Sequence, residues 1–284
     1  MSQQQPLFTE ESPFLKEDSR SQRWAIPYHY ECLNGRVDTL LASHTGDLRD
    51  CRVLDLASHM GTFAYAALQL GARHVYGVDT EESMVRKGVD LFQRMQVPND
   101  SYRFEVKDAF EFLEACEPDS FDTVFCFGLL YYVVEPLRLL KLMARVARRC
   151  ILLDTFTARY AALQGKDALQ YYPNISDEAL NLPILLTSLT QSEKKDYRLP
   201  NAFPYKGKEL SLTTFPSRAL LEIWFQVLGL EYKILGWDKY VLKPCDWRDL
   251  WTPEQKKASH WADVYASEVR VSYCLRPPSG SRLE

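Results

Sequence analysis

The stretch VLDLASHMGTFAYAALQLGARHVYGVD, residues 53–79, decides the fold of this chain. It begins as a short apolar strand with Asp55 near its end, passes through a tight turn, and enters an amphipathic helix near Gly61. A second apolar strand follows and ends in Asp79. A strand, turn, helix and strand in this order predict a βαβ unit, whose first turn commonly binds a nucleotide-like ligand.

The turn of this unit is poor in glycine. Ala57 and His59 flank Ser58 and occupy two positions where the pattern acid-x-Gly-x-Gly-x-Gly has glycine. In dinucleotide sites these glycines let the backbone approach a pyrophosphate, which larger residues crowd. A ligand that presents an amino-acid carboxylate makes weaker demands, and the backbone N–H groups beside Gly61 can face it. Asp55 at the strand end suits a ligand with positive charges, such as the ammonium and sulfonium groups of S-adenosylmethionine. The turn residues and Asp55 therefore predict S-adenosylmethionine as the cofactor and argue against NAD.

The end of the second strand extends the predicted cofactor site. Asp79 follows Asp55 at roughly the 20-residue spacing at which an acid accepts hydrogen bonds from a ribose diol. Thr80 comes directly after it and belongs to the same predicted site. Met84 lies on the next expected helix, where its polarisable side chain can form an apolar surface beneath an adenine.

A third acid follows the third expected strand. Asp108 can accept from the exocyclic amine of adenine, and Phe110 can pack on the ring, with Ala109 between them. An acid after a strand also commonly forms a turn or caps a helix, so each acid alone leaves a structural role open. Three acids at three successive strand ends together favour cofactor binding.

Apolar strands alternate with amphipathic helices along the first half of the chain. This alternation predicts right-handed crossovers and a parallel sheet covered on both faces. A later helix and two strands suit an antiparallel closing edge, so the expected fold is α/β, with a doubly wound, mostly parallel seven-stranded sheet. The expected strands cover residues 53–56, 74–78, 102–106, 121–127, 150–154, 230–235 and 269–275. The expected helices cover residues 61–70, 81–95, 109–115, 135–147 and 217–228.

The remaining segments suggest the domain organisation. Residues 1–20 are polar and predict a flexible N-terminal arm, and residues 21–284 predict a single domain. Residues 28–41 have apolar positions at helical spacing and predict a helix that precedes the first strand. Residues 158–210 contain several prolines and predict a long irregular or helical insertion that caps the substrate site.

Composition and charge exclude several classes of protein. The chain has 284 residues, of which 46% are hydrophobic and 25% charged, as expected for a globular protein. Its apolar runs are too short to span a bilayer and its first residues do not resemble a signal peptide, so we expect a cytoplasmic protein without membrane contact. A net charge of −4 argues against a nucleic-acid partner. The seven cysteines form no CxxC pair, and no His or Cys grouping has metal-site spacing, so we expect reduced thiols and no metal.

The chain resembles the core of class I S-adenosylmethionine-dependent methyltransferases in four segments, which occur in the order VLDLASHMGTFAYAALQLGA, VYGVDTEESM, EVKDAFEFL and FDTVFCFGLLYYVVEPLRLLKLMARVARRCILLDT. The resemblance extends over roughly residues 50–155 and 211–275 and implies a Rossmann-like fold and this cofactor. Within the superfamily, FDTVFCFGLLYYVVEPL is similar to strand four of the branch that contains transferases acting on the tRNA wobble uridine. The chain departs from that branch at Tyr132, where the branch often has histidine, so no catalytic base can be carried over.

The resemblance implies an acceptor site at the carboxyl ends of the fourth and fifth strands, beside the cofactor. Phe127 and Gly128 close the fourth strand and are assigned to the cofactor site. Tyr131 or Tyr132 can orient the acceptor, although either can instead pack the base of the insertion. His29 precedes the first helix and can contact the ligands as part of a lid or serve a structural role. We take these two tyrosines and His29 as the catalytic candidates.

The expected function is methyl transfer to an oxygen or nitrogen of a small-molecule acceptor, for example a biosynthetic metabolite. Two alternatives stay open: a tRNA-modifying transferase and a cofactor-binding protein without catalysis. A basic surface around the site would favour the tRNA enzyme, but acids dilute the one mildly basic stretch, residues 193–209. Turnover with a panel of acceptors would exclude the non-catalytic alternative.

Overall fold

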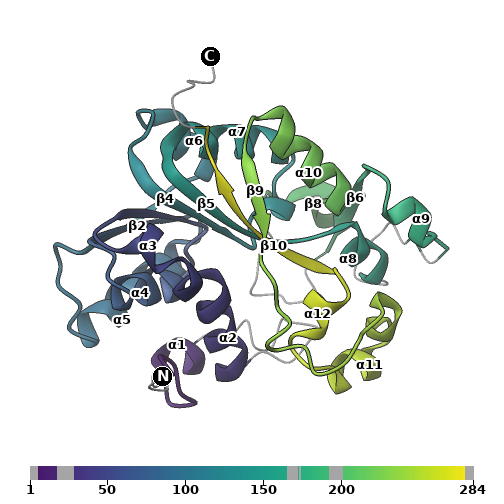
Figure 1. The fold of residues 1–284 in the computed structure, drawn as a ribbon, viewed down its shortest axis with the longest axis horizontal. Helices are drawn as coiled ribbons and strands as arrows, with labels where there is room; N and C mark the ends of the chain where they lie inside the picture. Colours follow the sequence, from purple (N-terminus) through teal and green to yellow (C-terminus); the bar gives the residue numbers. More distant parts are fainter. Residues whose placement is uncertain (1–5, 18–28, 165–171, 173, 192–200, 279–284) are drawn as a thin grey trace.

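A seven-stranded sheet forms the centre of the molecule in a computed structural model, which describes residues 6–17, 29–164, 172, 174–191 and 201–278 (Figure 1). The strand order is β3-β2-β1-β4-β5-β10-β9. Strands β1 to β5 pair in parallel, and β10 pairs antiparallel with both β5 and β9. The structure thus confirms the predicted doubly wound sheet with an antiparallel edge. The strands are β1 (Arg52–Leu56), β2 (His74–Asp79), β3 (Tyr102–Val106), β4 (Phe121–Phe127), β5 (Ala147–Phe156), β9 (Glu231–Ile234) and β10 (Arg270–Arg276).

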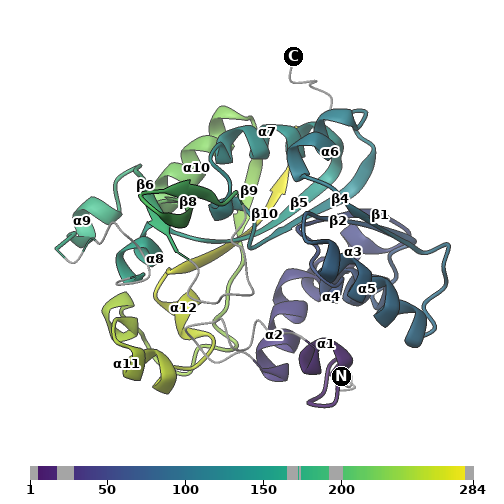
Figure 2. The same ribbon diagram turned by 180° about the vertical axis from the view of Figure 1, so that it is seen from behind.

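Helices cover both faces of this sheet (Figures 1 and 2). Successive residues of a strand point to opposite faces, so Phe125 of β4 joins one core cluster while its neighbours Val124 and Cys126 join the other. On the face of Phe125 lie α2 (Tyr30–Leu40), α3 (Thr45–Leu48), α4 (Thr62–Gln69) and α5 (Glu82–Arg94). On the opposite face lie α6 (Ala109–Ala115), α7 (Pro136–Val146) and α10 (Arg218–Val227).

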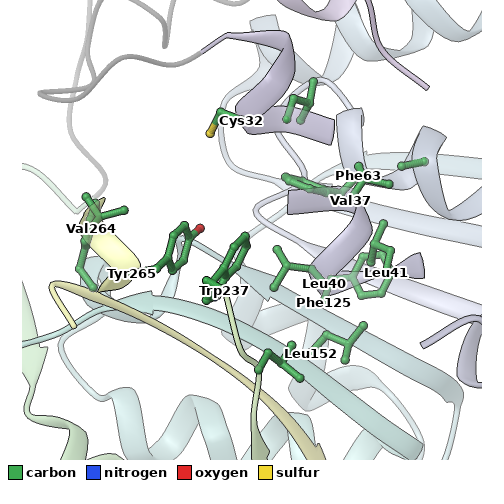
Figure 3. Close-up of a cluster of buried hydrophobic side chains, with 14 of the residues drawn as sticks. Cys32, Val37, Leu40, Leu41, Phe63, Phe125, Leu152, Trp237, Val264 and Tyr265 are labelled. Carbon is green, nitrogen blue, oxygen red and sulfur yellow. The ribbon is translucent and has the colours of Figure 1, made fainter. Parts of the chain in front are cut away.

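The core on the α2 side brings distant segments together (Figure 3). Leu40 of α2 is fully buried near Phe125 of β4 and Leu152 of β5. Trp237, which follows β9, stacks on Tyr265 with a centroid distance of 3.7 Å and an interplanar angle of 14°. The C-terminal third of the chain therefore completes the core that α2 begins. This third also contains η5 (Trp247–Leu250), α11 (Pro253–Ala258) and α12 (Asp263–Ala266).

The insertion differs from its prediction. We expected irregular or helical structure over residues 158–210, but β8 pairs antiparallel with β6 and β7 to form a second, three-stranded sheet. Proline misled the prediction, because Pro204 lies in a three-residue edge strand, where a missing N–H is tolerated. The elements of the insertion are α8 (Ala158–Leu163), α9 (Asp177–Leu180), β6 (Leu185–Thr190), β7 (Phe203–Tyr205) and β8 (Lys208–Pro216).

Part of the expected flexible arm is packed onto the domain. Phe8 and Phe14 are each only 1% exposed, and the Phe14 ring lies 5.3 Å from that of Tyr65 in α4. The backbone of Phe8 also exchanges two hydrogen bonds with the side-chain amide of Asn34, at 3.0 and 2.7 Å. Residues 6–17, which include α1 (Pro13–Lys16), are thus anchored to the core through Phe8 and Phe14, while residues 1–5 and 18–20 lie outside the described residues.

Candidate cofactor and acceptor site

The turn after β1 has the backbone of a glycine-rich turn although two of its positions carry side chains. Ala57, His59 and Gly61 have left-handed φ angles of 55°, 52° and 78°. Glycine adopts such angles readily, whereas a residue with a Cβ atom is destabilised by about 1–2 kcal/mol. Strain of this kind concentrates at ligand sites, so the geometry agrees with a binding role for the turn.

Hydrogen bonds fasten this turn to the end of β2. The N–H of Ser58 donates to the carbonyl of Val78 at 3.0 Å. The carboxylate of Asp79 accepts from the N–H of His59 at 2.8 Å through Oδ2 and from the N–H of Glu81 at 2.9 Å through Oδ1. Each carboxylate oxygen can accept more than one hydrogen bond. These contacts therefore orient Asp79 and are compatible with its predicted contact to a ribose.

The first turn of α4 offers polar groups to a ligand. Gly61 is the N-cap and gives the helix amides no side-chain hydrogen bond. The hydroxyl groups of Ser58 and Thr62 are buried and have no hydrogen-bond partner among the residues that the structure describes. Buried polar groups are normally satisfied, and a helix N-terminus favours a carboxylate. Together with the oriented Asp79, these groups fit S-adenosylmethionine as a ligand.

Three more predicted cofactor residues lie in β1, just after β2 and at the start of α5. Asp55 is 3% exposed and stands one residue before the end of β1. Thr80 is exposed just after β2, and Met84 is half-buried in the first turn of α5. A Cβ atom on Gly88 would lie 3.1 Å from the backbone of Met60, so α5 approaches the β1 turn closely.

Asp108 has the structural role that its position left open. Its Oδ1 accepts from the N–H groups of Phe110 at 2.8 Å and Glu111 at 3.3 Å, which caps α6. Ala109 is buried in the same helical turn. The guanidinium of Arg138 lies 5.2 Å from the centroid of the Phe110 ring. Contacts of Asp108 and Phe110 with an adenine stay predictions, and Arg138 already packs against the Phe110 ring.

The end of β4 lies next to α4. Gly128 has a φ of 87°, and its N–H donates to the carbonyl of Asp154 on β5 at 2.9 Å. The ring of Phe127 packs edge-on against Phe63 of α4, with the centroids 4.9 Å apart. The turns that follow β1, β2 and β4 therefore meet at the carboxyl edge of the sheet.

Tyr131 and Tyr132 belong to η3 (Leu130–Tyr132), and they differ in burial. Tyr131 is 7% exposed and packs against Phe156 of β5, at 5.0 Å, and Phe215 of β8, at 5.9 Å. Burial raises the pKa of the Tyr131 hydroxyl. Tyr132 is half-buried, with its ring 4.5 Å from that of Tyr131. Tyr131 packs at the base of the insertion, and a contact of either tyrosine with an acceptor stays a prediction.

His29 caps a helix. Its Nδ1 accepts from the N–H of Glu31 at 3.3 Å at the start of α2, and its side chain is 41% exposed. The described contacts of His29 are with Glu31 and Tyr30. Its predicted lid contact therefore stays a prediction, and residues 18–28, which precede it, lie outside the described residues.

A buried ionic group next to the acceptor end was not predicted. Arg36 of α2 donates to Asp154 Oδ2 at 2.6 Å, and Arg270 of β10 donates to the same oxygen at 2.9 Å. Ser272 donates to Asp154 Oδ1 at 2.8 Å. Burial alone would raise the pKa of Asp154, but Arg270 and Arg36 outweigh it and hold the pKa below its usual value. The sequence contained one signal for this group: Asp154 is a charged residue at the end of an apolar strand, a pattern that indicates a buried ion pair.

A comparison with protein families assigns the chain. The model of a methyltransferase domain family matches residues 47–198, which is more than half of the sequence. The chain belongs to this family and is therefore an enzyme that uses S-adenosylmethionine. A comparison with curated proteins finds no significant match.

Solved structures share the fold. An S-adenosylmethionine-dependent methyltransferase from Mesorhizobium loti has a TM-score of 0.54 at 17% identity, over 86% of this chain and 99% of that one. The YcgJ protein from Bacillus subtilis has a TM-score of 0.51 at 15% identity, over 89% and 100% of the two chains. The N-terminal domain of EvdMO1, crystallised in the presence of SAH and D-fucose, has a TM-score of 0.51 at 17% identity, over 86% and 82%. At these identities the likeness supports the fold alone.

The helices of the described residues were also compared with the requirements of a membrane span. None of these helices combines the length and the apolar character needed to cross a bilayer.

Proposed function

We propose that this enzyme transfers a methyl group to an oxygen or nitrogen of a small-molecule acceptor. The observation that carries the proposal is the joining of three strand-end turns at one sheet edge, with the Asp79 carboxylate fixed by the N–H groups of His59 and Glu81. Parallel sheets of this kind bind ligands in the crevice outside their carboxyl ends.

The residues of this edge have separate roles in the proposal. Asp79 accepts from the ribose hydroxyls, and the first turn of α4, with Thr62, receives the amino-acid carboxylate. The cofactor would supply a methyl group on a sulfonium sulfur. An acceptor oxygen or nitrogen would bond to the methyl carbon in line with the carbon–sulfur bond, which breaks and leaves S-adenosylhomocysteine. Positioning of the acceptor then accounts for much of the acceleration.

An aromatic wall supports a small acceptor. Tyr131, Phe156 and Phe215 pack together where the insertion meets the ends of β4 and β5. Tyr160 of α8 stacks on Phe156 with the centroids 4.0 Å apart. Phe156 and Phe215 are buried, whereas Tyr132 and Tyr160 are half-buried and can contact an apolar or planar molecule. Because burial raises the pKa of Tyr131, its hydroxyl stays protonated at neutral pH and can orient an acceptor without acting as a base.

A tRNA acceptor is the competing assignment, and the comparisons do not confirm the resemblance to the wobble-uridine branch. The basic residues Lys194, Lys195 and Arg198 lie outside the described residues. The formal net charge of −4 supports the small-molecule assignment.

Two measurements test the proposal. Calorimetry should detect binding of S-adenosylhomocysteine and little binding of NAD, and preferential binding of NAD would contradict the site. Methyl-labelled S-adenosylmethionine is then offered with a panel of hydroxyl and amine metabolites and, separately, with bulk tRNA. We expect label in a small molecule, and label in tRNA would put the competing assignment first.

A further inference from the structure

A second group of reactive side chains lies at the edge of the sheet opposite the candidate site. We call it the His44 cluster: His44 of η2 (Ala42–His44), Asp47 of α3, Cys150 near the start of β5 and Cys274 near the end of β10. Ligand atoms of His44, Asp47 and Cys274 all lie within 4.8 Å of one another. Because β10 is antiparallel to β5, the end of β10 and the start of β5 meet at this edge.

His44 is enclosed without full hydrogen bonding. Its side chain is 10% exposed, and its Nδ1 lies 3.7 Å from Asp47 Oδ2. Its Nε2 is buried and has no hydrogen-bond partner among the described residues. A buried imidazole nitrogen normally finds a partner, because leaving it unsatisfied is unfavourable. This nitrogen, on an imidazole beside the Cys274 thiol, is available to a ligand.

Cys150 brings a second sulfur to the cluster. Cys150 and Cys274 lie on the paired strands β5 and β10 and belong to the same core cluster, and Thr123 Oγ1 lies 3.6 Å from Cys150 Sγ. A thiolate at Cys274 is the form that binds a metal.

Arg276 orients the carboxylate of the cluster. Its two terminal nitrogens lie 3.1 and 2.8 Å from the Oδ1 and Oδ2 atoms of Asp47. Hydrogen bonds from such neighbours fix the direction of metal-ligating carboxylates in known sites. Asp47 is also anchored through its backbone, because its carbonyl accepts from Thr123 Oγ1 at 2.6 Å.

We propose that His44, Asp47 and Cys274 bind a zinc ion. Imidazole nitrogen, carboxylate oxygen and thiolate sulfur are the donors that Zn²⁺ takes in four-coordinate sites. The ligands come from η2, α3 and β10, so the ion joins the segment before β1 to the sheet. Because it lies at the edge opposite Asp79, the proposed role is structural and independent of methyl transfer. The sequence showed no such motif, because the ligands are spread over residues 44–274.

In the test, a chelator first removes any bound metal from the full chain. The protein is then titrated with Zn²⁺ in competition with a chromophoric chelator, which reports the affinity for Zn²⁺. We expect one equivalent to bind with a Kd below about 1 µM and to raise Tm. Co²⁺ in place of Zn²⁺ should give a thiolate-to-metal absorption band. If the wild-type protein does not bind Zn²⁺ stoichiometrically, or if the Co²⁺ form lacks this band, the proposal is overturned without any variant.

Variants assign the ligands. His44→Gln and Cys274→Ser should each weaken Zn²⁺ binding by roughly 100-fold or more. The matched controls His74→Gln and Cys116→Ser change the same residue types outside the cluster and should bind Zn²⁺ as the wild type does. Equal losses in variants and controls would contradict the site. The affinity of each variant for S-adenosylhomocysteine is measured in parallel as a control for folding. A loss of Zn²⁺ binding with this affinity unchanged concerns the zinc site and not the proposed function.

Discussion

Asp79 both shapes the turn and, in our proposal, binds the ribose. Asp79→Ala removes the acceptor for the ribose hydroxyls and releases the N–H groups of His59 and Glu81. We expect the free energy of S-adenosylhomocysteine binding to weaken by about 2–4 kcal/mol, measured by calorimetry. Asp90→Ala, an exposed acid on α5, is the control and should bind normally. An unchanged Kd in folded Asp79→Ala would show that the residue only forms the turn.

The two tyrosines of η3 can be separated by removing one hydroxyl at a time. Burial raises the pKa of Tyr131, so we do not expect it to accept a proton at neutral pH. Tyr131→Phe and Tyr132→Phe should leave cofactor affinity nearly unchanged and lower turnover of the acceptor by a few-fold, because only orientation is lost. A loss of around a hundredfold in either variant would instead identify a proton acceptor.

At the scale of elements, the β1–α4 turn stores backbone strain. Ala57 has a φ of 55°, which glycine adopts without the clash of a Cβ atom. Ala57→Gly should therefore raise the free energy of unfolding by up to about 1 kcal/mol, as measured in urea. Ala115→Gly, at an exposed helical position of α6, is the control and should lower it by up to about 1 kcal/mol. Equal losses in both variants would mean that the turn is unstrained.

At the scale of the whole molecule, Asp154 joins α2, β5 and β10. It is fully buried and accepts from Arg36, Arg270 and Ser272. Asp154→Asn removes the charge that compensates two buried guanidinium groups, so we expect the free energy of unfolding to fall by about 3–5 kcal/mol. Asp90→Asn on the surface should change it by less than about 0.5 kcal/mol. A similar small change in Asp154→Asn would contradict a stabilising role for this group.

The same carboxylate makes stability depend on pH. The pKa of Asp154 in the folded protein lies below its value in the unfolded chain, which is about 3.9. The contribution of Asp154 to the free energy of unfolding is therefore complete above about pH 4. It is lost as pH falls through the lower pKa that Asp154 has in the folded protein. We expect unfolding free energies measured from neutral to acid pH to decline less steeply below this value in Asp154→Asn than in the wild type. Parallel declines would show that other carboxylates dominate.

The sequence by itself determined the class of fold, the approximate spans of the sheet strands along the chain and the cofactor. Apolar residues alternate with a period of two in strands and of 3.6 in helices, and this local signal placed β3, β4 and α6 at their observed bounds. The insertion and the N-terminal segment were exceptions. The prolines of the insertion suggested irregular structure, but pairing with β8 formed strands that local propensity alone did not specify.

Only the tertiary structure decided which side chains meet. The bond between Asp79 and the backbone of His59 depends on the register of β1 with β2. Arg36 reaches Asp154 across 118 residues of sequence, and the His44 cluster also combines segments from both ends of the chain. No local pattern encodes such contacts, because they follow from how the helices and strands pack around the sheet. The acids at the strand ends were therefore visible in the sequence, whereas the buried ionic group and the proposed zinc site required the folded chain.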